Sequence, residues 1–118
     1  MKGFILFIIS SFMKNTLAPF LYTYGCIRSL MKKEFNKYHF DLAVSKDQYG
    51  NVIGKYLFNS IMIKKGGHSA GLPDETISSV IGKNKATNTL TFLGKGIAWI
   101  LNLIEPNHVE LAIEKDEL

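Results

Sequence analysis

The stretch TLTFLGKGIAWILNLI, residues 89–104, decides the fold class of the chain. Its large apolar side chains recur every three or four positions, which is the spacing of one face of an α-helix. They surround Trp99 and comprise Leu90, Leu93, Ile97, Ile100, Leu101 and Ile104. Thr89 belongs to the residue types that cap helix N-termini, and Pro106 interrupts the pattern. We therefore predict an amphipathic helix over residues 89–104 that packs Trp99 into the core.

A shorter helix is predicted upstream, over residues 73–82. Pro73 suits the first helical position, and Asp74 and Glu75 complement the positive end of the helix dipole. Gly82 is expected to close the helix. Its apolar face comprises Ile77, Val80 and Ile81.

The stretch from residue 35 to residue 63 admits two interpretations. Spacings of three and four favour a helix and involve Tyr38, Leu42, Tyr49, Val52, Ile53, Tyr56, Leu57 and Ile61. The alternation of apolar and polar residues over 40–45, followed by the turn-like DQYGN of residues 47–51, would instead suit a hairpin. The helical spacing persists after Tyr49, so we predict a helix with a break at Gly50 or Gly54. Residues 64–72, which hold three glycines, are predicted to form a loop.

These patterns together predict a mainly α fold with a small domain of about four helices over residues 31–118. The last of the four is expected to begin at Pro106, with Val109, Ala112 and Ile113 facing inward. A chain of 118 residues is long enough to bury a core of its own. Its single cysteine, Cys26, offers no intramolecular disulfide, which favours a reducing compartment.

Residues 1–30 form an apolar N-terminal segment ahead of that domain. Two uncharged runs, residues 4–13 and 15–27, are separated by Lys14 and are each too short to cross a bilayer alone. Read as one span, roughly residues 3–27, the segment is a candidate membrane anchor that must accommodate a lysine near its middle. A signal peptide is disfavoured because Pro19 would follow the candidate cleavage site after Ala18. The last alternative is an extension from an upstream start codon.

Net charge is +4 and is unevenly distributed along the chain. Residues 1–65 carry ten Lys and Arg against Glu34, Asp41 and Asp47, whereas residues 105–118 carry five acids and only Lys115. A basic half can face nucleic acid or anionic lipid, but a single arginine disfavours nucleic acid. The final KDEL matches an endoplasmic-reticulum retention signal, and we interpret it as a chance ending of an acidic helix.

Two parts of the sequence admit a catalytic interpretation. Residues 67–71, GHSAG, match the G-x-S-x-G elbow of serine hydrolases, but no buried strand runs into them and Pro73 follows too soon. A divalent metal could be held by Asp74, Glu75 and His108 with Asp47, which would suit a metal-assisted hydrolase or nuclease. Helix initiation already explains the acids at 74 and 75, so no catalytic residue and no cofactor are assigned.

Polar residues also gather in stretches that must pack. They comprise Asp47, Gln48, Asn51, Thr76, Ser78 and Ser79. Surface exposure or local capping would explain them, and the alternative is a buried polar network that joins the middle helix to the helix after Pro73.

Three blocks of the sequence resemble a family of small uncharacterised proteins of tailed phages and prophages. They are DQYGN at residues 47–51, PDETIS at residues 73–78, and His108 before an acidic end. Val109 stands where the family has a cysteine, so the family's thiol is absent here. The resemblance implies a phage or prophage origin and a bacterial host cytoplasm, and it implies no activity. We therefore expect a non-catalytic accessory protein with a protein partner. The alternatives are the metal-assisted hydrolase and a small membrane-associated protein.

Overall fold

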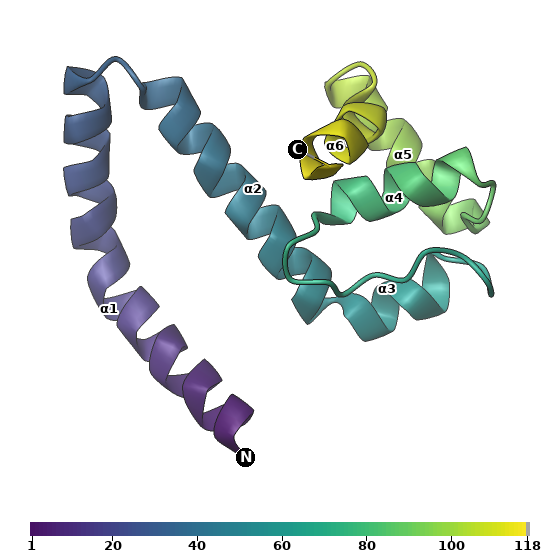
Figure 1. Ribbon diagram of the computed structural model, residues 1–118, viewed down its shortest axis with the longest axis horizontal. Helices are drawn as coiled ribbons and strands as arrows, with labels where there is room; N and C mark the ends of the chain where they lie inside the picture. The colour runs from purple at the N-terminus through teal and green to yellow at the C-terminus, as the bar shows by residue number, and fades with distance from the viewer. Residues whose placement is uncertain (118) are drawn as a thin grey trace. The chain divides into compact units, whose positions relative to one another are not determined.

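The computed structural model describes residues 1–117, and it describes the side chains of residues 1–113. The KDEL ending therefore lies outside the described side chains. Six helices follow one another in the described chain, α1 (Lys2–Met31), α2 (Phe35–Ile53), α3 (Lys55–Ile61), α4 (Ile77–Ala86), α5 (Phe92–Ile104) and α6 (His108–Glu117) (Figure 1). The mainly α prediction is confirmed. The chain divides into two compact units, Met1–Leu42 and Ala43–Leu118, and the division falls inside α2.

The first unit pairs the end of α1 with the start of α2. Lys33 adopts a left-handed backbone conformation with φ 59°, and the chain reverses there. Gly25 allows the Tyr38 ring to rest directly on α1, because a Cβ at this position would collide with the Tyr38 hydroxyl. The Tyr22 hydroxyl lies 2.8 Å from His39 Nε2, and the Nδ1 of the same ring contacts the Phe35 carbonyl oxygen at 2.9 Å. Almost all of α1 before this pairing is exposed.

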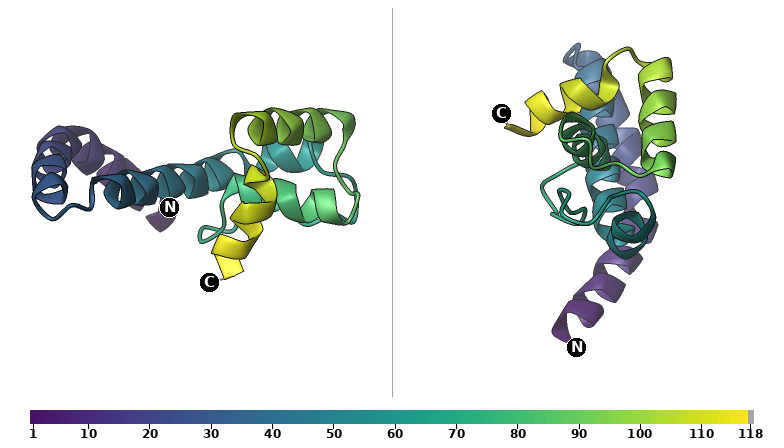
Figure 2. Two further views of the ribbon diagram at one scale, coloured as in Figure 1. Left: turned by 90° about the horizontal axis from the view of Figure 1, so that it is seen from above. Right: turned by 90° about the vertical axis from the view of Figure 1, so that its right-hand side faces the viewer.

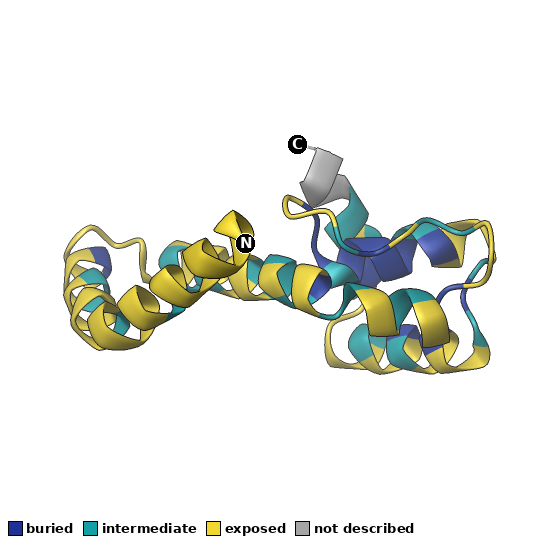
Figure 3. Cartoon of the chain, turned by 90° about the horizontal axis from the view of Figure 1, so that it is seen from below, coloured by how far each residue is buried: buried dark blue, intermediate teal, exposed yellow. Residues whose placement is uncertain are grey.

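The second unit is built around α4. The largest fully buried side chains of its core are Ile81, Leu90, Val80 and Val109, and Figure 3 shows the buried residues concentrated on α4 and its neighbours. α4 packs most extensively on α6, and α5 contacts both, as two further views show (Figure 2). Ile63 and Leu90 form an isolated antiparallel bridge, which ties the end of α3 to the start of α5. The predicted break in the middle helix is confirmed at Gly54, which caps α3.

The predicted bounds of α4 were wrong at both ends. Thr76 is the N-cap and its hydroxyl accepts the Ser79 N–H, so the helix begins at Ile77 rather than at Pro73. Gly82 does not end the helix. It lies in the interior of α4, where a Cβ would meet the Val109 carbonyl oxygen, so glycine serves close packing against α6.

Two expectations for α5 were also wrong. Thr91, not Thr89, caps the helix, since Thr91 Oγ1 accepts the Gly94 N–H at 3.2 Å while the Thr89 carbonyl accepts the Lys64 N–H at 2.7 Å. Trp99 is 66% exposed rather than packed in the core. Ala98 is the buried residue at this level of the helix, so the face that α5 turns inward is displaced from the indole.

Candidate functional site

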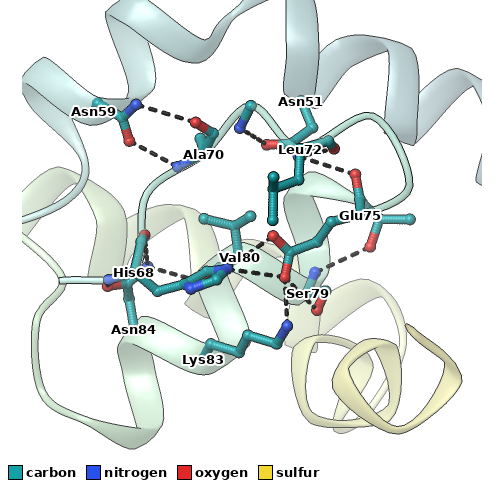
Figure 4. A network of polar contacts seen from close by, with 12 residues as sticks. Asn51, Asn59, His68, Ala70, Leu72, Glu75, Ser79, Val80, Lys83 and Asn84 are labelled. Carbon is teal, nitrogen blue, oxygen red and sulfur yellow. Dashed lines mark hydrogen bonds and ion pairs between the residues drawn. The ribbon is translucent and has the colours of Figure 1, made fainter. Parts of the chain in front are cut away.

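Three asparagine side chains hold the loop that leads into α4. Asn51 Nδ2 donates to the carbonyls of Leu72 (3.1 Å) and Glu75 (2.9 Å), while its Oδ1 accepts the Gly71 N–H (Figure 4). Asn59 pairs with both backbone groups of Ala70, accepting its N–H at 2.7 Å. A loop with no regular structure leaves its backbone groups without partners, and these side chains supply them.

Asn84 performs the same task from α4. Its Oδ1 accepts the His68 N–H at 2.8 Å and its Nδ2 donates to the His68 carbonyl at 2.8 Å. The Asn84 side chain thus makes the two hydrogen bonds to His68 that the backbone of a neighbouring β-strand would make. Asn51 and Asn84 are both fully buried. Among the described residues, no buried side-chain nitrogen or oxygen lacks a hydrogen-bond partner. The loop is thus fixed in place by the domain itself.

Glu75 forms a buried charge cluster beside α4. Its carboxylate contacts Lys83 Nζ at 2.5 Å, His68 Nε2 at 2.8 Å and the Ser79 hydroxyl at 3.4 Å. Burial alone would raise the pKa of the Glu75 carboxyl, but the hydrogen bonds from Lys83 and His68 outweigh it, and the pKa lies below its ordinary value. Glu75 is therefore an ion-paired core residue, and the prediction that it compensates a helix dipole was wrong.

Asp47, Ser78 and His108 meet at the start of α4. Asp47 Oδ1 accepts the Ile77 N–H and its Oδ2 accepts the Ser78 hydroxyl, both at 2.8 Å. Ser78 Oγ lies 3.1 Å from His108 Nε2, and His108 Nδ1 lies 3.1 Å from a Glu105 carboxylate oxygen. Asp47 reaches over from α2 and accepts the first N–H of α4, which has no partner within the helix.

The Ser78, His108 and Glu105 series has the connectivity of a serine-hydrolase triad, but not its proton arrangement. A nucleophilic serine must hand its proton to the histidine. Here the Ser78 hydroxyl donates its single proton to the Asp47 carboxylate, so that proton is not directed at His108 Nε2. Ser78 is also only 4% exposed, so its hydroxyl is not presented to a substrate. The series is a structural link between α2, α4 and α6.

The proposed metal ligands do not converge. Glu75 and His108 belong to separate clusters, and Asp74 is an exposed turn residue whose backbone carbonyl accepts a hydrogen bond from the Gln48 side chain at 3.2 Å. Within the described part of the chain, no group of three His, Cys, Asp or Glu side chains is arranged to hold a metal ion. The GHSAG stretch lies in the loop held by the asparagines, so Ser69 does not sit on the strand-to-helix turn that an elbow requires.

Sequence reasoning missed much of this site. The structural roles of Asn59, His68, Lys83, Asn84 and Glu105 were not predicted, although three glycines in a loop of nine residues signalled a backbone that needed side-chain partners. The chain matches no family model, no curated protein and no solved structure.

Proposed function

We propose that this protein is a small, phage-type accessory protein without catalytic activity that attaches to a membrane through α1 and presents the Ala43–Leu118 unit to a protein partner. The observation that carries the proposal is the surface of α1. Its large apolar side chains are exposed along the first two thirds of the helix; Phe12, for example, is 71% exposed. α1 is the one described helix long and apolar enough to cross a membrane, and none of its apolar window is buried.

The dimensions of α1 suit a bilayer. At about 1.5 Å per residue, 30 residues extend about 45 Å, against a hydrocarbon core of about 30 Å. Lys14 costs roughly 2.5–3.5 kcal/mol near the middle of a span. The ten Leu, Ile and Phe side chains between positions 3 and 23 offset this, because each contributes about 0.3–0.6 kcal/mol.

The charges at the two ends of α1 favour one orientation. Lys2 precedes the apolar stretch, whereas Arg28, Lys32, Lys33 and Lys37 follow it. Basic residues are retained on the cytoplasmic side of a membrane. The Ala43–Leu118 unit would then face the cytoplasm, in keeping with the bacterial host that the phage resemblance implies.

Two features support a binding role over catalysis. The side chains of Asp47, Asn51 and Ser78 are engaged in holding the loop and the start of α4, which is a structural use of the motif residues. α5 in contrast presents a row of exposed apolar side chains, including Phe92 (95% exposed), Trp99, Leu103 and Ile104. Exposed apolar rows that contain tryptophan are typical of protein interfaces.

Alkaline carbonate extraction of bacterial membranes tests the attachment. The full chain should stay in the membrane pellet, and the double variant Ile8→Lys with Phe12→Lys should move to the supernatant. The matched control is Ile53→Lys with Leu57→Lys, which places two lysines at comparably exposed apolar positions outside α1 and should stay in the pellet. Extraction of the unmodified full chain into the supernatant would contradict the proposal.

A further inference from the structure

A recess of about 250 Å³ lies in the first unit, between the end of α1 and the start of α2. By the ~30 Å³ that a water occupies in the liquid, it has room for about eight waters, which exceeds the needs of one phosphate group. Its lining is polar and aromatic and includes Tyr24, Arg28, Lys32, Lys37 and Tyr38.

The charges of the lining leave cations available for a ligand. Lys37 Nζ pairs with Asp41 at 2.7 Å, so these two charges largely cancel. Glu34 also lines the recess. Arg28 and Lys32 stand four positions apart at the end of α1, and neither forms an ion pair with any residue that the structure describes. Arginine binds phosphate through two parallel hydrogen bonds, and lysine adds a point charge.

We propose that this recess binds the phosphate of an anionic phospholipid headgroup, with Arg28 and Lys32 as the principal contacts. The inference rests on the proposed membrane attachment of α1. A lipid is favoured over a soluble phosphate because the recess lies directly after the apolar stretch of the same helix, at the level where a span would leave the hydrocarbon. Tyr22 and Tyr24 stand at this level, where tyrosine is enriched in membrane proteins, and basic recesses beside a span bind anionic headgroups.

Vesicle flotation of the full chain tests the inference. Vesicles of phosphatidylcholine are compared with vesicles of phosphatidylcholine and phosphatidylglycerol. Each basic residue near an anionic surface contributes about fivefold in affinity by diffuse attraction alone, or about 30-fold for two residues. Arg28→Gln with Lys32→Gln should weaken binding to the phosphatidylglycerol vesicles by more than this, because the direct contacts with the phosphate are lost as well. Binding to the neutral vesicles should be unchanged, because the apolar part of α1 is intact.

The matched control is Lys33→Gln with Lys46→Gln, which removes the same net charge from positions outside the recess lining. Its loss should not exceed the about 30-fold of diffuse attraction; a loss equal to that of the recess variant would show diffuse attraction and overturn the site. Equal affinity of the native chain for both vesicles would also overturn the site while leaving membrane attachment intact. Absence of binding to either vesicle would overturn both. Tighter binding of inorganic phosphate by the native chain than by Arg28→Gln with Lys32→Gln, together with equal flotation of the two on phosphatidylglycerol vesicles, would identify a soluble ligand and overturn the lipid assignment.

Discussion

Glu75 and Glu110 each form an ion pair with a lysine of α4, but the two pairs differ in burial. Each accepts from an α4 lysine at 2.5 Å, Glu75 from Lys83 and Glu110 from Lys85, but the Glu75 side chain is 5% exposed and that of Glu110 is 44% exposed. Hydrogen bonds between charged groups contribute roughly 1.5–3 kcal/mol when buried, and exposed ion pairs contribute about 0–1 kcal/mol. The buried Glu75 pair should therefore contribute more to the free energy of unfolding than the exposed Glu110 pair.

We predict that Glu75→Gln lowers the free energy of unfolding by about 2 kcal/mol and that Glu110→Gln lowers it by less than about 1 kcal/mol. Chemical denaturation of the two variants beside the native protein measures both values. Equal losses would show that Glu75 is not held in a buried cluster.

The depressed pKa of Glu75 also predicts a pH dependence. Because its pKa in the folded protein lies below the ordinary value, the charged carboxylate stabilises the fold at neutral pH. That contribution is fully present above the ordinary pKa of glutamate and is lost as the pH falls through the folded-state pKa. The difference in unfolding free energy between native protein and Glu75→Gln should accordingly shrink as the pH is lowered below about 4.3. A difference that stays constant over this range would contradict the assignment.

Asp47 and Asp74 both belong to the sequence blocks singled out above, yet only Asp47 has a structural task. Asp47→Ala would leave the Ile77 N–H without a partner and remove the acceptor of the buried Ser78 hydroxyl, at a cost of about 2 kcal/mol. Asp74→Asn should change stability by less than about 0.5 kcal/mol, because the residue is exposed and lies outside the helix. Thermal unfolding of both variants measures the two losses of stability. A larger loss for Asp74→Asn than for Asp47→Ala would show that Asp74 supports α4.

Among the elements, two helical glycines should respond to alanine in opposite directions. Gly50 in α2 has open space around its Cα, whereas a Cβ at Gly82 would meet the Val109 carbonyl and the Ile113 side chain. Gly50→Ala should stabilise the protein by about 0.5–1 kcal/mol, since alanine is the better helix former. Gly82→Ala should destabilise it by about 1–3 kcal/mol, because α4 and α6 must separate. Denaturant midpoints of the two variants test the packing, and a stabilising Gly82→Ala would refute it.

The positions of the elements could be predicted from the sequence because their periodicity is local. The break at Gly54 and the loop over residues 64–72 followed from glycine placement and helical spacing. The start of α4 could not be predicted, since Pro73, Asp74 and Glu75 satisfy every local rule for helix initiation, and the outcome was set by long-range contacts. Asn51 draws the Glu75 carbonyl toward α2, and Thr76 then takes the capping position.

The site shows the same limit. Asp47, Ser78 and His108 are each identifiable in the sequence as candidate site residues. Their contact could not be predicted, because it depends on how α2, α4 and α6 pack. The inward face of α5 likewise depends on its partners: Ala98 is buried in the core, and the larger Trp99 stays exposed. A stripe of apolar residues identifies a helix but does not identify which part of the stripe is buried when the stripe is wide.

For the whole molecule, we propose that the Ala43–Leu118 unit is a folded domain that needs no membrane, and that the apolar part of α1 is a membrane segment that contributes nothing to the core of that domain. The support for this claim is the contrast between the exposed apolar surface of α1 and the satisfied, buried polar contacts around α4.

Hydrogen–deuterium exchange of the full chain, measured with and without phosphatidylcholine vesicles, tests this claim most directly. Backbone amides of residues 3–21 should exchange rapidly in buffer, because a helix without packing opens easily, and should become strongly protected when vesicles are added. Amides of α4 and α6 should be protected to the same degree in both conditions. Protection of residues 3–21 in buffer alone, or unchanged exchange on addition of vesicles, would contradict the claim.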